Sequence, residues 1–163
     1  MEITKIPAAK TAMLIRRPVA EVFEAFIDPT ITSKFWFTKG SGRLEKGKQI
    51  KWDWEMYGTS TKVYVNEVEQ NRRILIEWDG YSGKTTVEWL FNARTINETF
   101  VTVTESGWTG NGDELIKYAL NSTGGFTFMI SGLKAFLEHN IALNLTADHA
   151  PDNIKKGYLS GNA

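Results

Sequence analysis

Apolar and polar residues alternate over most of the stretch from Gln49 to Glu105, and this period of two constrains the fold more than any other feature. Successive side chains of a strand point to opposite faces of a sheet, so the alternation predicts strands that are buried on one side only. The connections, such as GYSGK and TINE, have the length of hairpin turns. The segment therefore predicts an antiparallel meander, with strands at 49–56, 60–68, 73–78, 85–94 and 100–105 and a short strand near 42–45.

The two faces of this predicted sheet differ in chemistry. The outer face is expected to carry charged side chains into water, namely Lys51, Asp53, Glu55, Glu77, Glu88 and Arg94. The inner face is expected to carry Ile50, Trp52, Trp54, Ile74, Ile76, Trp78, Val87, Trp89, Phe91, Val101 and Val103. An apolar face of this extent has to be covered by another element.

Helical patterns flank the meander. After a first strand at 10–17, Pro18 fits the first turn of a helix that ends near Asp28, and 31–37 is expected to form a second short helix. On the C-terminal side, apolar residues at spacings of three, four and seven predict a long amphipathic helix, with Ser122 as its N-cap and 113–120 as a helical lead-in. The repeated residues are Phe126, Met129, Ile130, Leu133, Phe136 and Leu137.

Three glycines, Gly124, Gly125 and Gly132, lie within this predicted helix. Each is unfavourable in a helix interior by about 1 kcal/mol relative to alanine. Their presence indicates either that the backbone approaches the sheet closely or that space is left beside the helix. Both arrangements suit a helix that covers a sheet.

Length and composition indicate how many domains the chain forms, which compartment it occupies and which partners it binds. The 163 residues are expected to form one domain, with a core at about 9–143 and a weakly ordered polar tail at 144–163. The absence of cysteine and of a signal-like N-terminus favours the reducing cytoplasm, and no apolar run predicts a membrane span. Nineteen basic residues balance nineteen acidic ones, so the charge predicts no nucleic-acid partner.

The sequence Gly80-Tyr81-Ser82-Gly83-Lys84-Thr85 resembles the glycine-rich loop of nucleotide-binding proteins. That loop needs four residues between its first glycine and Gly-Lys, and it leads into a helix whose N-terminus meets the phosphates. Here only two residues intervene, and the alternating TTVEWLF that follows predicts a strand. The motif is therefore interpreted as a hairpin turn.

Catalytic and metal-binding patterns are weak. His139 and His149 have no second ligand at metal-binding spacing, and the carboxylates of the outer face lack the shelter that acid–base chemistry requires. Tyr64 and Tyr118 are the best polar candidates to reach a cavity, but neither acquires a proton-transfer role. We therefore expect no catalytic residue, no metal and no cofactor.

The order of elements, together with RRPVAEVFEAFIDPTITSKFWF, VNEVEQNRRILIEW, Gly107-Trp108 and GLKAFLEHN, resembles the helix-grip superfamily of START-like and Bet v 1-like (SRPBCC) proteins. Within it, the chain is most similar, over about residues 9–143, to bacterial proteins that resemble the C-terminal domain of the activator of the Hsp90 ATPase. The resemblance implies an α+β fold in which a curved antiparallel sheet wraps around the long C-terminal helix, with two short helices near the N-terminus. It also implies an apolar cavity between sheet and helix.

These patterns predict a non-catalytic protein that binds a small hydrophobic, lipid-like or aromatic molecule between sheet and helix. Two alternatives remain open. One is a cyclase- or hydratase-type enzyme that uses the same cavity, and the other is an interaction domain for a chaperone or for a second copy in a homodimer. The candidate ligand-binding residues are Trp36, Trp52, Trp54, Tyr64, Trp78, Trp89, Phe91, Phe126, Met129 and Leu133.

Overall fold

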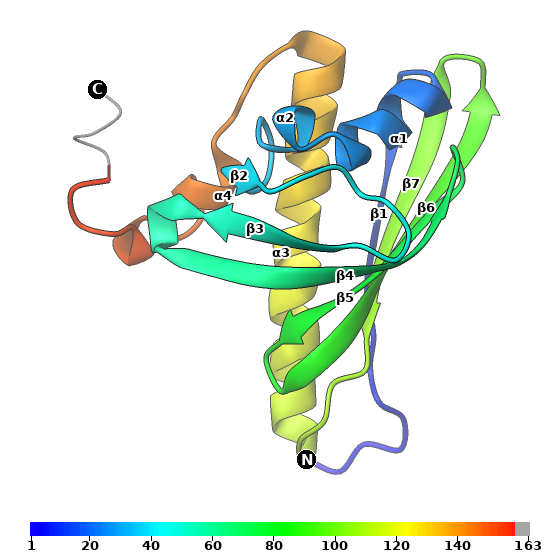
Figure 1. The fold of residues 1–163 in the computed structure, drawn as a ribbon. Coiled ribbons are helices and arrows are strands. Elements are labelled where there is room, and N and C mark those ends of the chain that lie inside the picture. Colours follow the sequence, from blue (N-terminus) through cyan, green and yellow to red (C-terminus); the bar gives the residue numbers. More distant parts are fainter. Residues whose placement is uncertain (159–163) are drawn as a thin grey trace.

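A seven-stranded antiparallel sheet curves around one long helix in the computed structural model, which describes residues 1–158 (Figure 1). The strand order is β1-β7-β6-β5-β4-β3-β2, so every neighbour except β1 and β7 is also a neighbour in sequence. This is the expected helix-grip arrangement. The strands are β1 (Ala9–Ile15), β2 (Lys39–Gly40), β3 (Gln49–Trp54), β4 (Thr59–Glu69), β5 (Arg73–Gly80), β6 (Gly83–Thr95) and β7 (Glu98–Ser106).

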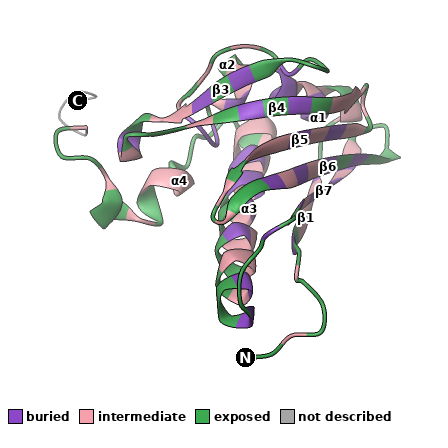
Figure 2. Ribbon diagram, turned by 60° about the horizontal axis from the view of Figure 1, so that its bottom comes forward, coloured by how far each residue is buried: buried purple, intermediate pink, exposed green. Residues whose placement is uncertain are grey.

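The alternation of side chains produces the two predicted faces. Buried and more exposed residues alternate along the strands, as Figure 2 shows. Ile74 and Ile76 are fully buried, while Glu77 and Glu88 lie on the opposite face. In the main core, the inner residues of the sheet pack with Phe23 and Phe26 of helix α1 (Val19–Ile27).

The turn between β5 and β6 confirms the interpretation of the glycine motif. Gly80 pairs with Gly83, so only Tyr81 and Ser82 form the loop of the hairpin. Gly83 has a φ of 121°, which a side chain would disfavour. The motif leads into strand β6 rather than into a helix, so it does not form the phosphate loop of nucleotide-binding proteins.

Helix α3 (Gly112–His139) is longer than predicted. It runs without a break from a capping box in which the Asn111 side chain accepts from the Glu114 amide and the Glu114 side chain accepts from the Asn111 amide. The prediction that Ser122 caps the helix is wrong, because Ser122 lies within it and is buried. The predicted lead-in at 113–120 is part of the same helix, because tertiary packing overrides the low helix propensity of the glycines that follow.

The glycines of α3 serve two different purposes. A Cβ atom at Gly132 would lie 3.1 Å from the carbonyl oxygen of Phe35, so this glycine permits close approach of the helix to the segment after α2. At Gly124 and Gly125 a Cβ atom would meet nothing within 4 Å. The helix therefore leaves open space at these two positions.

The second short helix and the short strand differ from the prediction. Helix α2 spans only Pro29–Thr32, where the Asp28 side chain accepts from the Thr30 amide and caps the helix. The aromatic residues at 35–37 follow α2 in an irregular segment. The short strand near 42–45 is replaced by β2 at Lys39–Gly40, which pairs with Asp53 and Trp52 of β3.

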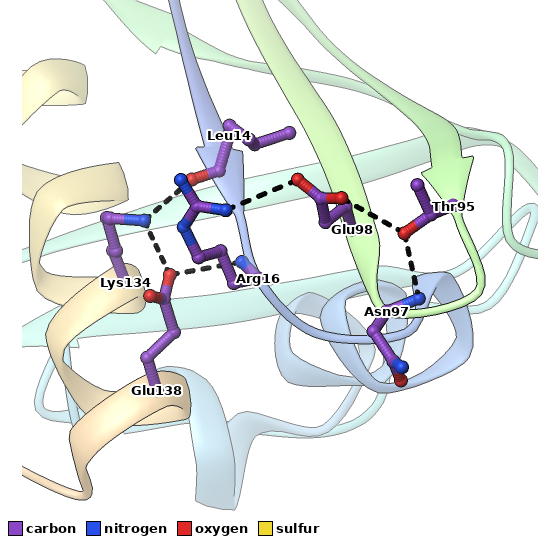
Figure 3. A network of polar contacts seen from close by, with 7 residues as sticks. All are labelled: Leu14, Arg16, Thr95, Asn97, Glu98, Lys134 and Glu138. Carbon is purple, nitrogen blue, oxygen red and sulfur yellow. Dashed lines mark hydrogen bonds and ion pairs between the residues drawn. The ribbon is translucent and has the colours of Figure 1, made fainter.

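Polar side chains of α3 bind the backbone of strand β1, as Figure 3 shows. Lys134 Nζ donates to the carbonyl oxygen of Leu14 at 2.9 Å and to Glu138 Oε2 at 2.7 Å. The backbone amide of Arg16 donates to the same carboxylate at 3.1 Å. Hydrogen bonds and the neighbouring Lys134 outweigh partial burial and lower the pKa of Glu138, so the carboxylate stays charged at neutral pH. This network ties the helix to the edge of the sheet.

The segment after α3 was predicted to be weakly ordered, but its described part contains helix α4 (Leu145–Asp148) and the 3₁₀ helix η2 (Pro151–Asn153). It packs beside the 3₁₀ helix η1 (Glu55–Tyr57), where the Lys155 amide donates to the Met56 carbonyl oxygen at 2.6 Å. Residues 159–163 of the predicted tail lie outside the described residues. Within residues 1–158, no helix is long and apolar enough to span a membrane.

Candidate functional site

A cavity of about 340 Å³ lies between the inner face of the sheet and helix α3. Its volume falls in the range of small-molecule sites, about 300–1,000 Å³. The sheet, α3, the segment after α2 and the C-terminal segment all contribute side chains. The lining residues include Trp36, Trp54, Thr59, Thr61, Trp78, Tyr81, Glu105, Ser122, Gly125, Phe126, Phe128, Thr146 and His149.

Aromatic rings form much of the cavity wall. Trp36 lies edge-on to Trp54, with ring centroids 5.6 Å apart, and 6.0 Å from Trp78. Trp78 stacks on Phe126 at 6.0 Å, which joins the sheet to the helix. Flat rings that face a cavity offer large apolar surfaces, and their negative π faces also attract positive charge.

Glu105 lies on the inner face of β7 and is the one buried acidic residue among residues 1–158, with 2% of its surface exposed. Three neutral donors hold its carboxylate. Trp78 Nε1 and Thr85 Oγ1 donate to Oε2 at 2.7 Å and 2.6 Å, and Ser122 Oγ donates to Oε1 at 2.7 Å. The donors come from β5, β6 and α3, so the carboxylate connects the helix to the sheet at the cavity wall.

The charge of Glu105 has no basic partner. Among the ion pairs formed by residues 1–158, none includes Glu105. A carboxylate offers about four acceptor positions, two on each oxygen. In Glu105, two donors bind Oε2 and one donor binds Oε1. One position on Oε1 is therefore left for another donor.

Tyr81 lies near this carboxylate at the β5–β6 turn, and its ring stacks on Tyr118 with centroids 5.1 Å apart. Partial burial raises the pKa of Tyr81, and the negative charge of Glu105 raises it further. The phenol is thus neutral at physiological pH. It contributes a polar edge to a wall that is otherwise mostly aromatic.

The predicted ligand-binding residues divide into three groups. Trp36, Trp54, Trp78 and Phe126 line the cavity. Tyr64 lies on the outer face of the sheet, where Lys84 Nζ sits 4.5 Å from its ring centroid. The remaining candidates are buried in the main core and are not among the cavity-lining residues, namely Trp52, Trp89, Phe91, Met129 and Leu133.

A second cavity, of about 570 Å³, lies between the segment after α2 and the C-terminal segment. Trp36 and Thr146 line both cavities, so they stand between them. The C-terminal segment is held by the Tyr57 hydroxyl, which donates to the Thr146 carbonyl oxygen, and by the ring of His149, which lies 5.0 Å from that of Phe128. It therefore closes part of the first cavity.

The Tyr57 contact predicts a pH dependence of stability. Burial raises the pKa of Tyr57 above its ordinary value of 10.0, and the charge of Asp148 raises it further. The folded state thus favours the neutral phenol, so the resulting stabilisation is complete below about pH 10 and is lost as pH rises through the folded-state pKa. Replacing Tyr57 by phenylalanine should cost about 1 kcal/mol at neutral pH, and this difference should shrink above about pH 10.

Urea unfolding of both proteins across neutral and alkaline pH measures this difference. Tyr64→Phe is the matched control for loss of a tyrosine hydroxyl, and it should cost less than Tyr57→Phe at neutral pH because Tyr64 is exposed on the outer face of the sheet. A difference between wild type and Tyr57→Phe that stays constant into the alkaline range would contradict the prediction.

No group of three or more His, Cys, Asp and Glu side chains that could hold a metal ion occurs within the described part of the chain.

Comparison with known proteins identifies relatives of this architecture. Residues 16–138 match the model of the family described as activator of Hsp90 ATPase homolog 1-like protein. No protein with a curated description matches the sequence. The crystal structure of protein SSP2350 from Staphylococcus saprophyticus is 31% identical, with a TM-score of 0.74, and the match covers 84% of this chain and 96% of that one.

Two further solved structures share the fold at lower identity. DynU16, a putative protein of the dynemicin biosynthetic locus, is 23% identical, with a TM-score of 0.72 and coverage of 83% of this chain and 48% of that one. The Aha1 dimer from Colwellia psychrerythraea is 19% identical, with a TM-score of 0.69 and coverage of 82% of this chain and 97% of that one.

Proposed function

Because the chain belongs to the activator of Hsp90 ATPase homolog 1-like family, we propose that it uses the helix-grip fold to bind a small, mainly apolar molecule without chemical change. The observation that carries the proposal is the cavity of about 340 Å³ whose wall includes four of the predicted aromatic side chains. Apolar walls with a few convergent polar groups are the usual composition of a small-molecule site.

Helix α3 supports the proposal by the way it leaves space. Gly125 lines the cavity, and a Cβ atom there would meet no other atom within 4 Å. A glycine at this place costs helix stability, by about 1 kcal/mol relative to alanine. Helix α3 is thus less stable than it would be with alanine at this position, where a larger side chain would fill the cavity.

A series of substitutions at Gly125 tests the proposal. Alanine and leucine should both raise helix propensity, but leucine places its side chain in the space that a ligand would occupy. We expect Gly125→Leu to lower the affinity for a cavity ligand by about tenfold or more, equivalent to about 1.4 kcal/mol, without lowering the free energy of unfolding. Gly125→Ala should have a smaller effect on binding.

Native mass spectrometry of the purified protein, before and after denaturing extraction, identifies a co-purified compound, and quenching of tryptophan fluorescence gives its affinity. Gly124→Ala is the matched control, since Gly124 also has open space around it but does not line the cavity. It should raise stability and leave binding unchanged. Equal affinities for wild type and Gly125→Leu would overturn the proposed site.

The second candidate function is a cyclase- or hydratase-type enzyme, and the inward carboxylate of Glu105 is the observation in its favour. A general acid or base needs a sheltered position within reach of the substrate. The same mass spectrometry separates the two functions. A compound recovered unchanged after prolonged incubation with the protein supports binding alone, whereas a product that forms with wild type and not with Glu105→Gln supports the enzyme.

A further inference from the structure

The cavity described above is asymmetric in charge. Two acidic residues, Asp79 and Glu105, are among its lining residues, and Glu105 is the one whose side chain lies on the inner face of the sheet. Among residues 1–158, no lysine or arginine lines the cavity, and His149 is the one lining residue with a basic side chain. Lys62 and Lys84 instead line a separate small cavity of about 90 Å³, together with Asp79 and with Tyr64 of the outer face. The inner cavity therefore favours positive over negative charge in an occupant.

Glu105 is the residue that gives the cavity its negative charge. Its carboxylate is 2% exposed, lines the cavity and is held by three neutral donors with no cation beside it. A buried charge is costly unless it is paired as well as hydrogen-bonded. The acceptor position left on Oε1 suits an additional N–H donor, so a cationic group with an N–H bond would supply both the missing charge and the missing hydrogen bond.

The aromatic wall adds a second attraction for the same charge. Trp36, Trp54 and Trp78 line the cavity together with Phe126, and Trp78 also donates to Glu105. The faces of tryptophan rings attract an ammonium group that lies within about 6 Å of the ring centroid. The carboxylate of Glu105 and the tryptophan rings thus both favour a protonated amino group in the occupant.

We propose that the occupant of this cavity is a hydrophobic amine, an aromatic molecule whose protonated amino group binds Glu105 while its rings lie against Trp54, Trp78 and Phe126. This inference rests on the proposed binding function and names its ligand class. It also gives Glu105 a role in recognition, in addition to its hydrogen bonds between α3 and the sheet.

Three probes of similar shape test the charge preference on the full-length protein. They are naphthylmethylamine, naphthylmethanol and naphthoate, which are cationic, neutral and anionic at neutral pH. By isothermal titration we expect the amine to bind about tenfold or more tightly than the alcohol, as one charge-assisted contact together with a cation–π contact implies. Naphthoate should bind most weakly.

Glu105→Gln separates the charge from the fold. The glutamine oxygen accepts from Trp78 and Thr85, and its amide donates to Ser122, whose hydroxyl then accepts, so the three hydrogen bonds are retained. We expect the amine to lose its advantage over the alcohol in this variant, while the affinity of the alcohol stays the same. Glu77→Gln is the matched control, because it removes the same charge next to Trp78 but on the opposite face of β5.

The possible outcomes are distinguishable. A preference for the amine that depends on Glu105 and survives Glu77→Gln supports it. Equal binding of amine and alcohol to wild type would overturn the inference and leave the proposed function standing, and this comparison needs no variant to fold. A preference that persists in Glu105→Gln would overturn the role of Glu105. Failure of all three probes to bind would count against the proposed function itself.

Discussion

Replacement of Trp52 by alanine is expected to lower the free energy of unfolding by about 3–5 kcal/mol. Trp52 is 2% exposed, stacks on Phe37 with centroids 5.1 Å apart and lies 5.0 Å from Trp36. The removed ring would leave a void between β3 and the segment after α2, which the surrounding side chains fill only in part. A loss of this size is a large fraction of the stability of a typical domain, about 5–15 kcal/mol.

Urea unfolding followed by circular dichroism measures the loss, with Trp54→Ala as the matched control. Trp54 is the second residue along from Trp52 in β3 and lines the cavity, so part of its surface is not packed. We expect a smaller loss for Trp54→Ala and, in that variant, weaker ligand binding. Equal losses of stability would contradict the division of the tryptophans between core and cavity wall.

The second large effect is expected for Trp108→Ala, and it should be local. Trp108 is 1% exposed and packs with Ala9 and Leu115 in a small cluster that is separate from the main core. Ile3 and Tyr118 border this cluster, so it joins the N-terminal segment to the first turns of α3. We expect a loss of about 3 kcal/mol or more, most of it in this part of the molecule.

Hydrogen exchange locates the loss. In Trp108→Ala, amides near Leu115 and Tyr118 should exchange much faster, while those near Met129 and Leu133 keep most of their protection. Trp108→Phe, which retains a ring, should show little of this change. A uniform loss of protection along α3 would contradict the separation of the two clusters.

The period of two predicts strands β3 to β7 and the two faces of the sheet, because burial on one side produces alternation within a strand. It does not predict β2 at Lys39–Gly40, nor the irregularity between Val65 and Glu67 that shifts the register of β4. The same rule applies to Glu105, a site residue that is not among the predicted ones. Glu105 follows Val101 and Val103 at a spacing of two, so it belongs to the inner face. A charged residue is rarely buried, but three donors from other elements make the burial of Glu105 tolerable.

The alternation along a strand predicts which face of the sheet a side chain lies on. It does not predict whether that side chain is packed in the core or borders the cavity. Trp52 and Trp54 share parity, yet only Trp54 lines the cavity. The curvature of the sheet and the path of α3 decide which inner residues are packed and which border open space. Gly125 and Gly132 show the same limit, since one leaves room and the other permits close approach. These properties depend on contacts between distant segments, which local patterns do not reveal.

The contacts between α3 and β1 also bear on how copies of the protein can associate. An open edge strand offers free backbone groups to which another chain can add as a further strand, and proteins that lack protection there tend to aggregate. At one edge, Lys134 and Glu138 occupy the carbonyl of Leu14 and the amide of Arg16 (Figure 3). At the other, β2 is only two residues long. Each edge therefore carries a feature that disfavours growth of the sheet from one molecule into the next.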